Sequence, residues 1–375
     1  MAAFGKQSLS AARAWYARNE HRISVISFFG GFAVDALTLT RADKIGENIF
    51  AGVRLAIVAA CIVLIARKER AAREAGGAAG DNPERDHFVL VTVMQFIFGS
   101  LLSTFLIFYF RSAALAVSWP FFLIVGAAAV ANETHKRHYS RIGFQTGFFF
   151  LSVYLFAAYA MPLVMNEVGR KTFVAAGIAS LGIMLLFFAG IKRLAGTQPP
   201  RSRRAALGAV IAVTLVMNGF YFLGIIPPLP LLLQDAGIYH SVSRTADGHY
   251  AVTEEPATIF RRALTLINSY PPYHADTDTA YAYTAVFSPG SFRTVITHEW
   301  QQYDDSARRW ETRARIPLAV TGGRDGGFRT YSLYGRLQEG KWRVNVLAPG
   351  GETIGRMSFK VTKSIPPSMR ETVKD

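Results

Sequence analysis

The sequence predicts a two-part protein, with a multi-pass α-helical membrane domain followed by a C-terminal all-β domain, an Ig-like antiparallel sandwich. Three observations lead to this fold class. Long apolar segments fill the chain up to Ile226 and end at Pro227 and Pro228. Short segments of alternating polarity, separated by turn residues, fill the rest. The charged fraction of the 375-residue chain is 18%, below the roughly 25% that is usual for soluble proteins.

The apolar segments are long enough to cross a membrane. A spanning helix needs about 20 predominantly apolar residues, and seven segments fit this description. They are 23–40, 47–66, 88–110, 113–131, 142–165, 172–191 and 205–226. The third and the fifth contain no charged side chain, whereas the second contains Arg54. We therefore expect about seven transmembrane helices within residues 1–227.

The loops between these segments differ in charge, which predicts an orientation. Lys and Arg concentrate in cytoplasmic loops. The N-terminal segment and the even-numbered loops hold about 17 basic residues, and the odd-numbered loops hold about 5. We therefore expect a cytoplasmic N-terminus and, after seven spans, a periplasmic C-terminal domain on a bacterial inner membrane. A lumenal domain in a eukaryotic membrane is an alternative. One span more or fewer would place the C-terminal domain in the cytoplasm.

The net charge of +15 is divided unevenly along the chain. Residues 1–227 carry a net charge of +12 and residues 228–375 a net charge of +3. Basicity of this size can indicate nucleic acid as a partner. Its concentration in the membrane part instead predicts a cytoplasmic rim that faces the anionic headgroups of a lipid bilayer, with no nucleic acid as a partner.

The C-terminal part begins with a change of pattern. Pro227-Pro228-Leu229-Pro230 makes a continuing helix improbable. We expect a proline-rich neck and the first strands over 228–290, and the sandwich over 291–375. Alternation is clearest at Tyr281–Phe287, Ile316–Val320 and Trp342–Val346. A single cysteine excludes an internal disulfide.

The C-terminal motifs resemble a known family. They are Tyr283–Phe287, His298–Gln301, Gly322–Arg329, Tyr331–Ser332, Gly340–Val346, Gly355–Arg356 and Phe359–Val361. In these residues the chain resembles bacterial membrane proteins that carry the domain of unknown function numbered twenty-nine-fourteen, here over roughly 295–362. The membrane part is similar to these proteins at Gly31–Asp35, Phe108–Arg111 and Ser118–Phe121. The resemblance implies a fold but no catalytic residues, substrate or cofactor.

Two ionisable residues lie inside predicted spans. Such groups usually face a protein interior or a cavity. In a helical hairpin formed by the first two spans, Asp35 and Arg54 lie level with each other, so we predict an intramembrane ion pair. A pair that fixes helix packing is the favoured interpretation. A substrate or proton site, or snorkelling at the lipid face, are the alternatives.

The sandwich offers a possible ligand face. His298 and Trp300 lie on the same face of a strand because alternate strand residues do. With Arg329 and Arg343, they could bind a ligand. The alternative interpretation places the aromatic residues in the core and the arginines on a solvated face.

The sequence predicts neither a metal site nor a cofactor. His274, Asp276 and Asp278 match no calcium-loop spacing. No GxSxG, HExxH, Walker A or GxGxxG motif occurs in its required context. We therefore lean against an enzyme.

The sequence favours an integral inner-membrane protein whose periplasmic sandwich binds an envelope component, either a glycan or a protein. The membrane domain would anchor or scaffold it. One alternative is a transporter or channel that uses Asp35 and Arg54. Another is a membrane enzyme that acts on a lipid-linked substrate.

Overall fold

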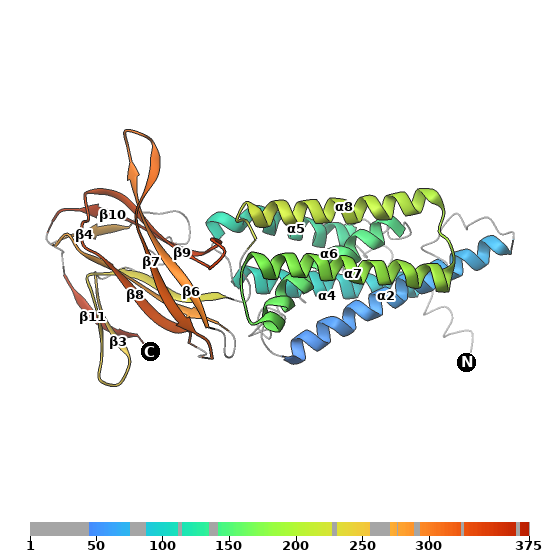
Figure 1. Ribbon diagram of the computed structural model, residues 1–375, viewed down its shortest axis with the longest axis horizontal. Coiled ribbons are helices and arrows are strands. Elements are labelled where there is room, and N and C mark those ends of the chain that lie inside the picture. Colours follow the sequence, from blue (N-terminus) through green and yellow to red (C-terminus); the bar gives the residue numbers. More distant parts are fainter. Residues whose placement is uncertain are drawn as a thin grey trace, which may run out of the picture. The chain divides into compact units, whose positions relative to one another are not determined.

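The computed structural model describes most of the chain from Ile45 onward (Figure 1). The described residues are 45–75, 88–111, 115–134, 142–226, 231–255, 271–275, 277–288, 293–323, 326–364 and 368–374. They form six helices followed by eleven strands. The chain divides into two compact units. One consists of residues 1–108, 122–157 and 176–218, and the other of 109–121, 158–175 and 219–375.

The helices follow the apolar segments of the sequence. They are α2 Ile45–Glu74, α4 Phe88–Arg111, α5 Leu115–Thr134, α6 Ile142–Met165, α7 Arg170–Ala195 and α8 Pro200–Phe222. Five of them, all but α5, are long and apolar enough to cross a membrane. Helix α5 contributes the shorter apolar stretch Ser118–Ala127. Six of the seven predicted segments thus coincide with helices, and the first, 23–40, lies outside the described residues.

The helices expose apolar side chains and pack through small residues. Leu185 and Leu186 of α7 are 71% and 74% exposed, as expected for helices whose outer surface faces lipid rather than water. A Cβ atom added to Gly143 of α6 would lie 2.7 Å from the Cβ atom of Ala205 in α8. Glycine therefore permits the close approach of these two helices, a common device in membrane bundles.

The C-terminal region is all-β. Its strands are β1 Leu232–Tyr239, β2 Ser241–Arg244, β3 Tyr250–Glu254, β4 Pro272–His274, β5 Ala280–Phe287, β6 Arg293–Asp304, β7 Arg309–Thr321, β8 Phe328–Tyr334, β9 Gly340–Leu347, β10 Thr353–Thr362 and β11 Arg370–Lys374. They form three sheets of order β1-β5-β8, β4-β10-β9-β6-β7 and β11-β3-β2. All pairings are antiparallel except the short parallel pair of β4 with β10.

The main core of this region lies between the first two of these sheets. Ala282 and Val286 of β5 meet Trp300 of β6, Trp342 of β9 and Phe359 of β10, and all five are buried. These side chains come from alternate positions along their strands, which directs them to one face of each sheet. The predicted fold class, apolar helices followed by a β region with antiparallel sheets, is confirmed.

Candidate functional site: the polar face of the five-stranded sheet

The five-stranded sheet carries polar side chains on the side opposite its core. Because Trp300, Trp342 and Phe359 point into the core, their strand neighbours point to the other side. We call this side the polar face. It is formed by Glu299, Gln301 and Tyr303 of β6, Trp310, Thr312 and Arg315 of β7, Lys341, Arg343 and Asn345 of β9, and Arg356, Ser358 and Lys360 of β10.

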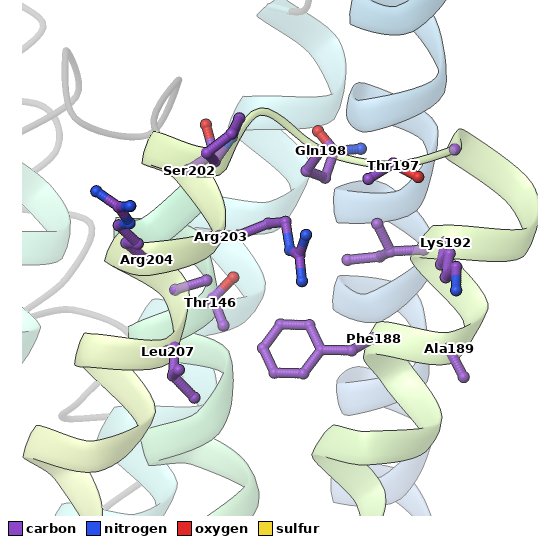
Figure 2. Close-up of a pocket in the computed structure, with 14 residues that line it drawn as sticks. Thr146, Phe188, Ala189, Lys192, Thr197, Gln198, Ser202, Arg203, Arg204 and Leu207 are labelled. Atoms are coloured by element: carbon purple, nitrogen blue, oxygen red, sulfur yellow. The ribbon is translucent and has the colours of Figure 1, made fainter.

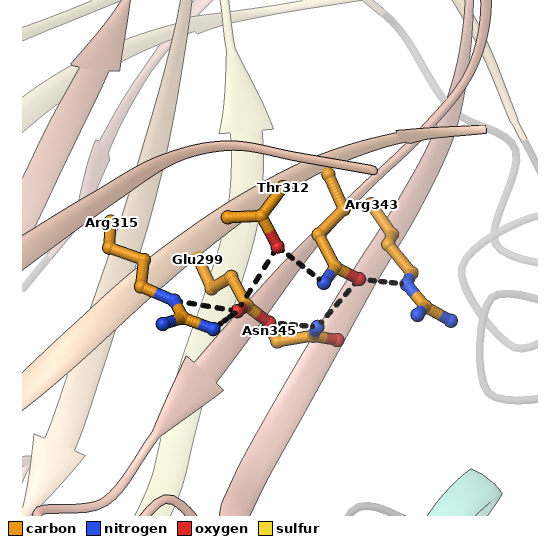
Figure 3. A network of polar contacts seen from close by, with 6 residues as sticks. Glu299, Thr312, Arg315, Arg343 and Asn345 are labelled. Carbon is orange, nitrogen blue, oxygen red and sulfur yellow. Dashed lines mark hydrogen bonds and ion pairs between the residues drawn. The ribbon is translucent and has the colours of Figure 1, made fainter. Parts of the chain in front are cut away.

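Glu299 lies at the centre of the polar face, and its side chain is only 8% exposed. Its Oε1 accepts hydrogen bonds from Arg315 Nε and Nη2 at 2.9 and 2.7 Å. The Thr312 hydroxyl donates to the same oxygen at 3.4 Å. Its Oε2 accepts a hydrogen bond from Asn345 Nδ2 at 3.0 Å (Figure 3). Both carboxylate oxygens are therefore satisfied, as a buried charge requires.

Gln301 continues this network toward the other strands. Its Nε2 donates to the Thr312 hydroxyl at 3.0 Å. Its Oε1 accepts from Arg343 Nε at 2.7 Å and from Asn345 Nδ2 at 3.2 Å. The Asn345 Oδ1 accepts from Arg356 Nε at 2.7 Å. The network thus links four adjacent strands and sets the directions of three arginines.

Aromatic rings continue the polar face beyond the network. The Arg343 guanidinium carbon lies 4.2 Å from the centre of the Trp310 ring, a cation–π distance. Trp310 in turn meets Tyr303 edge to face, with ring centres 5.2 Å apart. The Lys341 ammonium lies 5.5 Å from the Tyr303 ring centre. Two cations and two rings therefore form one contiguous group.

A β-bulge brings the β7 residues onto this face. Opposite β6, the pairing shifts so that Trp300 is paired with Ala314 and Gln301 with Thr312. Arg313 is the extra residue. In a regular strand, Thr312 and Arg315 would point to opposite sides, because they are three residues apart. The bulge turns both toward Glu299, which is a common effect of bulges on side-chain direction.

The polar face carries an excess of positive charge. Its five basic residues stand against one carboxylate, that of Glu299. They are Arg315, Lys341, Arg343, Arg356 and Lys360. Burial raises the pKa of Glu299, but hydrogen bonds from Asn345 and Arg315 and the Arg315 charge outweigh this effect and hold the pKa below its ordinary value. Glu299 is therefore an anion at neutral pH and orients the cations around it.

The structure places His298 and Trp300 in the core, on the side opposite Arg343. Both are fully buried. The Trp300 indole N–H donates to Ser332 Oγ at 3.0 Å. The two ring nitrogens of His298 lie 2.8 Å from Ser332 Oγ and 3.0 Å from Thr284 Oγ1. Burial lowers the pKa of His298 to about 4, so this ring is a neutral link between β6 and the strands β5 and β8.

Arg329 lies on β8, in the three-stranded sheet. Its carbonyl oxygen accepts a 3.4 Å hydrogen bond from the Tyr250 hydroxyl. Arg329 and Arg343 therefore lie on different sheets. Of the four residues predicted for a ligand face, the polar face contains only Arg343.

Arg54 lies in α2 and is half-buried. It donates a 3.1 Å hydrogen bond from Nη1 to Thr104 Oγ1 of α4. Its guanidinium carbon also lies 4.0 Å from the centre of the Phe50 ring. Asp35 lies outside the described residues, so the predicted Asp35–Arg54 ion pair stays a prediction.

The described part of the chain contains no group of three His, Cys, Asp or Glu side chains suited to a metal ion. His274 instead contacts the Glu255 carboxylate, with Nδ1 2.6 Å from Oε2. Asp278 pairs with Lys363 at 3.3 Å, and Asp276 lies outside the described residues.

Sequence reasoning missed the central residues of the polar face, namely Glu299, Gln301 and Asn345. The signal was present, because these residues alternate with Trp300, Val344 and Val346, which are core residues. Alternation alone shows which side they face. It does not show that they bond to one another, since this depends on register and on the bulge.

The solved structures with a weak likeness to this chain include the following three. A β-glucosidase from Listeria innocua in complex with isofagomine is 11% identical, with a TM-score of 0.20, over 38% of this chain and 18% of that chain. A β-glucosidase from Kluyveromyces marxianus is 8% identical, with a TM-score of 0.17, over 40% and 16%. An alkylpurine DNA glycosylase from Pseudomonas fluorescens, bound to DNA containing an abasic site analog, is 10% identical, with a TM-score of 0.20, over 86% and 99%.

This chain spans less than a fifth of the length of either β-glucosidase. At TM-scores this low, none of the three likenesses carries an argument about the fold or the function of this protein. A search of curated proteins gives no match to this chain. A family model does match in the C-terminal region, over residues 293–361, which include β6, β7, β8, β9 and nearly all of β10. The C-terminal region therefore carries the domain DUF2914, whose description is "protein of unknown function".

Proposed function

We propose that this protein is a membrane-anchored binding protein of the bacterial inner membrane. Its periplasmic β region binds an acidic envelope glycan through the polar face, and the helices anchor it. The observation that carries this proposal is the fixed cluster of arginines around the buried Glu299. The proposed orientation has its support in the charge bias of the loops.

A buried ionic network does not in itself support stability. Well-packed apolar residues in its place are often as stabilising or more so. What such a network does provide is a set of side chains held in fixed directions. A binding site that is ordered before its ligand arrives loses less conformational entropy on binding. The network around Glu299 therefore suits recognition better than it suits simple stabilisation.

The composition of the polar face favours an acidic glycan. Its excess of basic side chains attracts anions, and arginine binds carboxylates with paired N–H groups. Tyr303 and Trp310 add ring surface next to Lys341 and Arg343, and sugar rings can pack against such surface. A carboxylated sugar polymer would use both properties.

The test measures glycan binding by the full-length protein in detergent. Polygalacturonate is the acidic probe and dextran the neutral one. We expect binding of the acidic probe alone, and about tenfold weaker binding for Arg343→Gln, because a charge-assisted bond is lost. The matched control is Arg309→Gln. This residue is exposed at the start of β7 and pairs with Glu311 at 3.3 Å, away from the network.

Equal binding of dextran and polygalacturonate would contradict the proposal, and so would an equal effect of the two substitutions. A protein partner is the alternative outcome. It would be recognised if neither polysaccharide bound, while a photo-crosslinking side chain at position 343 coupled to a polypeptide in cells.

A further inference from the structure

A pocket of about 740 Å³ lies at one end of the helical unit. It is formed by the C-terminal end of α7, the connection 196–199 and the N-terminal end of α8, with Thr146 of α6 completing its wall. Figure 2 shows Arg203 of α8 and Phe188 of α7 pointing toward one another across it. We call it the α7–α8 pocket. All of its lining residues belong to a single compact unit.

Three cations and no carboxylate line the α7–α8 pocket. They are Lys192, Arg203 and Arg204. Within the described ranges, no acidic side chain forms an ion pair with any of the three. The pocket therefore has a positive charge that its own residues do not neutralise, which favours an anionic ligand.

Two buried polar groups of the pocket have no hydrogen-bond partner in the described part of the chain. Thr146 is fully buried, and its hydroxyl, in the pocket wall, has no partner. The same holds for the Nε2 atom of Gln198, which is buried although its side chain is half-exposed. A buried polar group without a partner destabilises the folded protein. An anion in the pocket could accept a hydrogen bond from each of these groups.

The backbone at the start of α8 also favours an anionic ligand. The first turn of α8 begins at Pro200, which has no N–H group, and the Arg203 N–H already donates to Pro199 O at 3.0 Å. The N–H groups of Arg201 and Ser202 lie in the same turn, where the helix supplies no acceptor. The helix dipole also favours negative charge at this end. The first turn of α8 contains no acidic residue that would satisfy this preference.

The rest of the wall is apolar. Phe188, Ile191, Ala206 and Leu207 line the pocket together with the cations. A free inorganic ion gains nothing from such a wall. A lipid carries an anionic phosphate next to apolar chains, so it matches both parts of the lining. Basic pockets between membrane helices are common places for anionic headgroups.

We propose that the α7–α8 pocket binds the phosphate group of an anionic phospholipid. Lys192, Arg203 and Arg204 neutralise the phosphate, Thr146 and Gln198 donate hydrogen bonds to it, and Phe188 and Leu207 contact the start of the acyl chains. This site lies in the helical unit and does not depend on the glycan site proposed for the polar face.

The test measures lipid retention by the full-length protein. Phosphatidylglycerol or phosphatidylcholine is titrated into detergent-solubilised protein, and bound lipid is counted by native mass spectrometry. We expect preferential retention of phosphatidylglycerol. The double substitution Lys192→Gln/Arg203→Gln should weaken it about tenfold or more, since each basic residue adds substantially to the attraction of an anionic lipid.

The matched control is Arg193→Gln/Arg201→Gln. It removes the same charge from the same two helix ends, but both residues are exposed and neither lines the pocket. We expect less than a twofold effect. Equal losses in the two variants would show a general effect of surface charge and overturn the proposal. Equal retention of the two lipids would overturn it as well.

The Thr146→Val substitution tests the buried hydroxyl without changing charge or size. We expect several-fold weaker phosphatidylglycerol binding, with thermal stability of the lipid-free protein unchanged or raised, because an unsatisfied buried group is removed. Unchanged lipid binding would overturn the role of Thr146.

The last experiment adds millimolar inorganic phosphate to the protein in place of lipid. Protection from heat by phosphate, without retained lipid, would keep the phosphate site but overturn a lipid as its source.

Discussion

His298 shows most clearly how one side chain links the sheets of the β region. It is fully buried, and its two nitrogens meet hydroxyls of β5 and β8. The chain of contacts runs from Thr284 through His298 and Ser332 to Trp300. A neutral imidazole suits this position because hydroxyl groups both donate and accept hydrogen bonds.

The stability of the β region should depend on pH through His298. Its folded pKa of about 4 lies below the ordinary 6.5, so the unfolded chain binds a proton first as pH falls. The neutral His298 ring contributes about 3 kcal/mol to the free energy of unfolding. This contribution is fully present above pH 6.5 and is lost as the pH falls from there to about 4. Denaturation midpoints measured across this range by tryptophan fluorescence would test it.

The His298→Gln variant is the control for this pH dependence. Glutamine can bond to both hydroxyls but does not titrate, so its denaturation midpoint should fall less between pH 6.5 and pH 4. An identical slope in the variant and the parent protein would assign the pH dependence to other groups.

Glu299 should contribute to stability only as part of its network. The Glu299→Ala substitution leaves the buried Asn345 amide and the Thr312 hydroxyl without this acceptor, whereas Arg315, with a side chain that is 67% exposed, can be hydrated instead. We expect a loss of about 2 kcal/mol in the free energy of unfolding. Glu311→Ala removes a more exposed acid that pairs with Arg309 and Arg313. This change should cost less than about 1 kcal/mol, and similar losses in the two variants would argue against a network.

At the scale of elements, the β7 bulge decides which side chains belong to the polar face. Deleting Arg313 should remove the bulge and still leave Thr312 opposite Gln301, because Thr312 and Arg315 are then two residues apart and alternate residues share a side. We expect the Arg343–Trp310 contact to remain and the free energy of unfolding to fall by about 1 kcal/mol or less. Arg313→Ala keeps the extra residue and should cost about 1 kcal/mol or less. Chemical denaturation compares the two, and a loss of several kcal/mol in the deletion variant alone would show that this pairing does not survive without the extra residue.

The helices and strands could be predicted where a local sequence pattern determines them, but not where they depend on residues distant in the sequence. Helices α4, α6 and α7 could be predicted because a membrane span requires a long apolar run, which composition alone reveals. The strand Trp342–Val346 could be predicted from its period of two. The bulge at Arg313 could not, because nothing local marks it. The polar face combines residues up to 61 positions apart, from Glu299 to Lys360, and only strand register brings them together.

At the scale of the whole molecule, orientation in the membrane is the property that most needs a test. We expect an alkaline phosphatase fused after Asp375 to be active, because this enzyme folds in the periplasm. A fusion after Ala75, which follows the basic end of α2, should be inactive. The reverse pattern would indicate an even number of spans and place the β region in the cytoplasm. Because the first predicted span lies outside the described residues, this measurement also tests its existence.

The order of the strands in the five-stranded sheet limits the ways in which the proposed glycan can bind to it. Strand β7 forms one edge of this sheet, and the three-residue β4 forms the other. The edge at β7 includes Pro317, which has no N–H group, and the exposed Arg309, Arg313 and Arg315. Charges and proline at an edge discourage strand addition. We therefore expect the proposed glycan to contact side chains across the sheet rather than to pair with the main chain at its edge. The same charges and proline discourage two copies of the protein from pairing edge to edge.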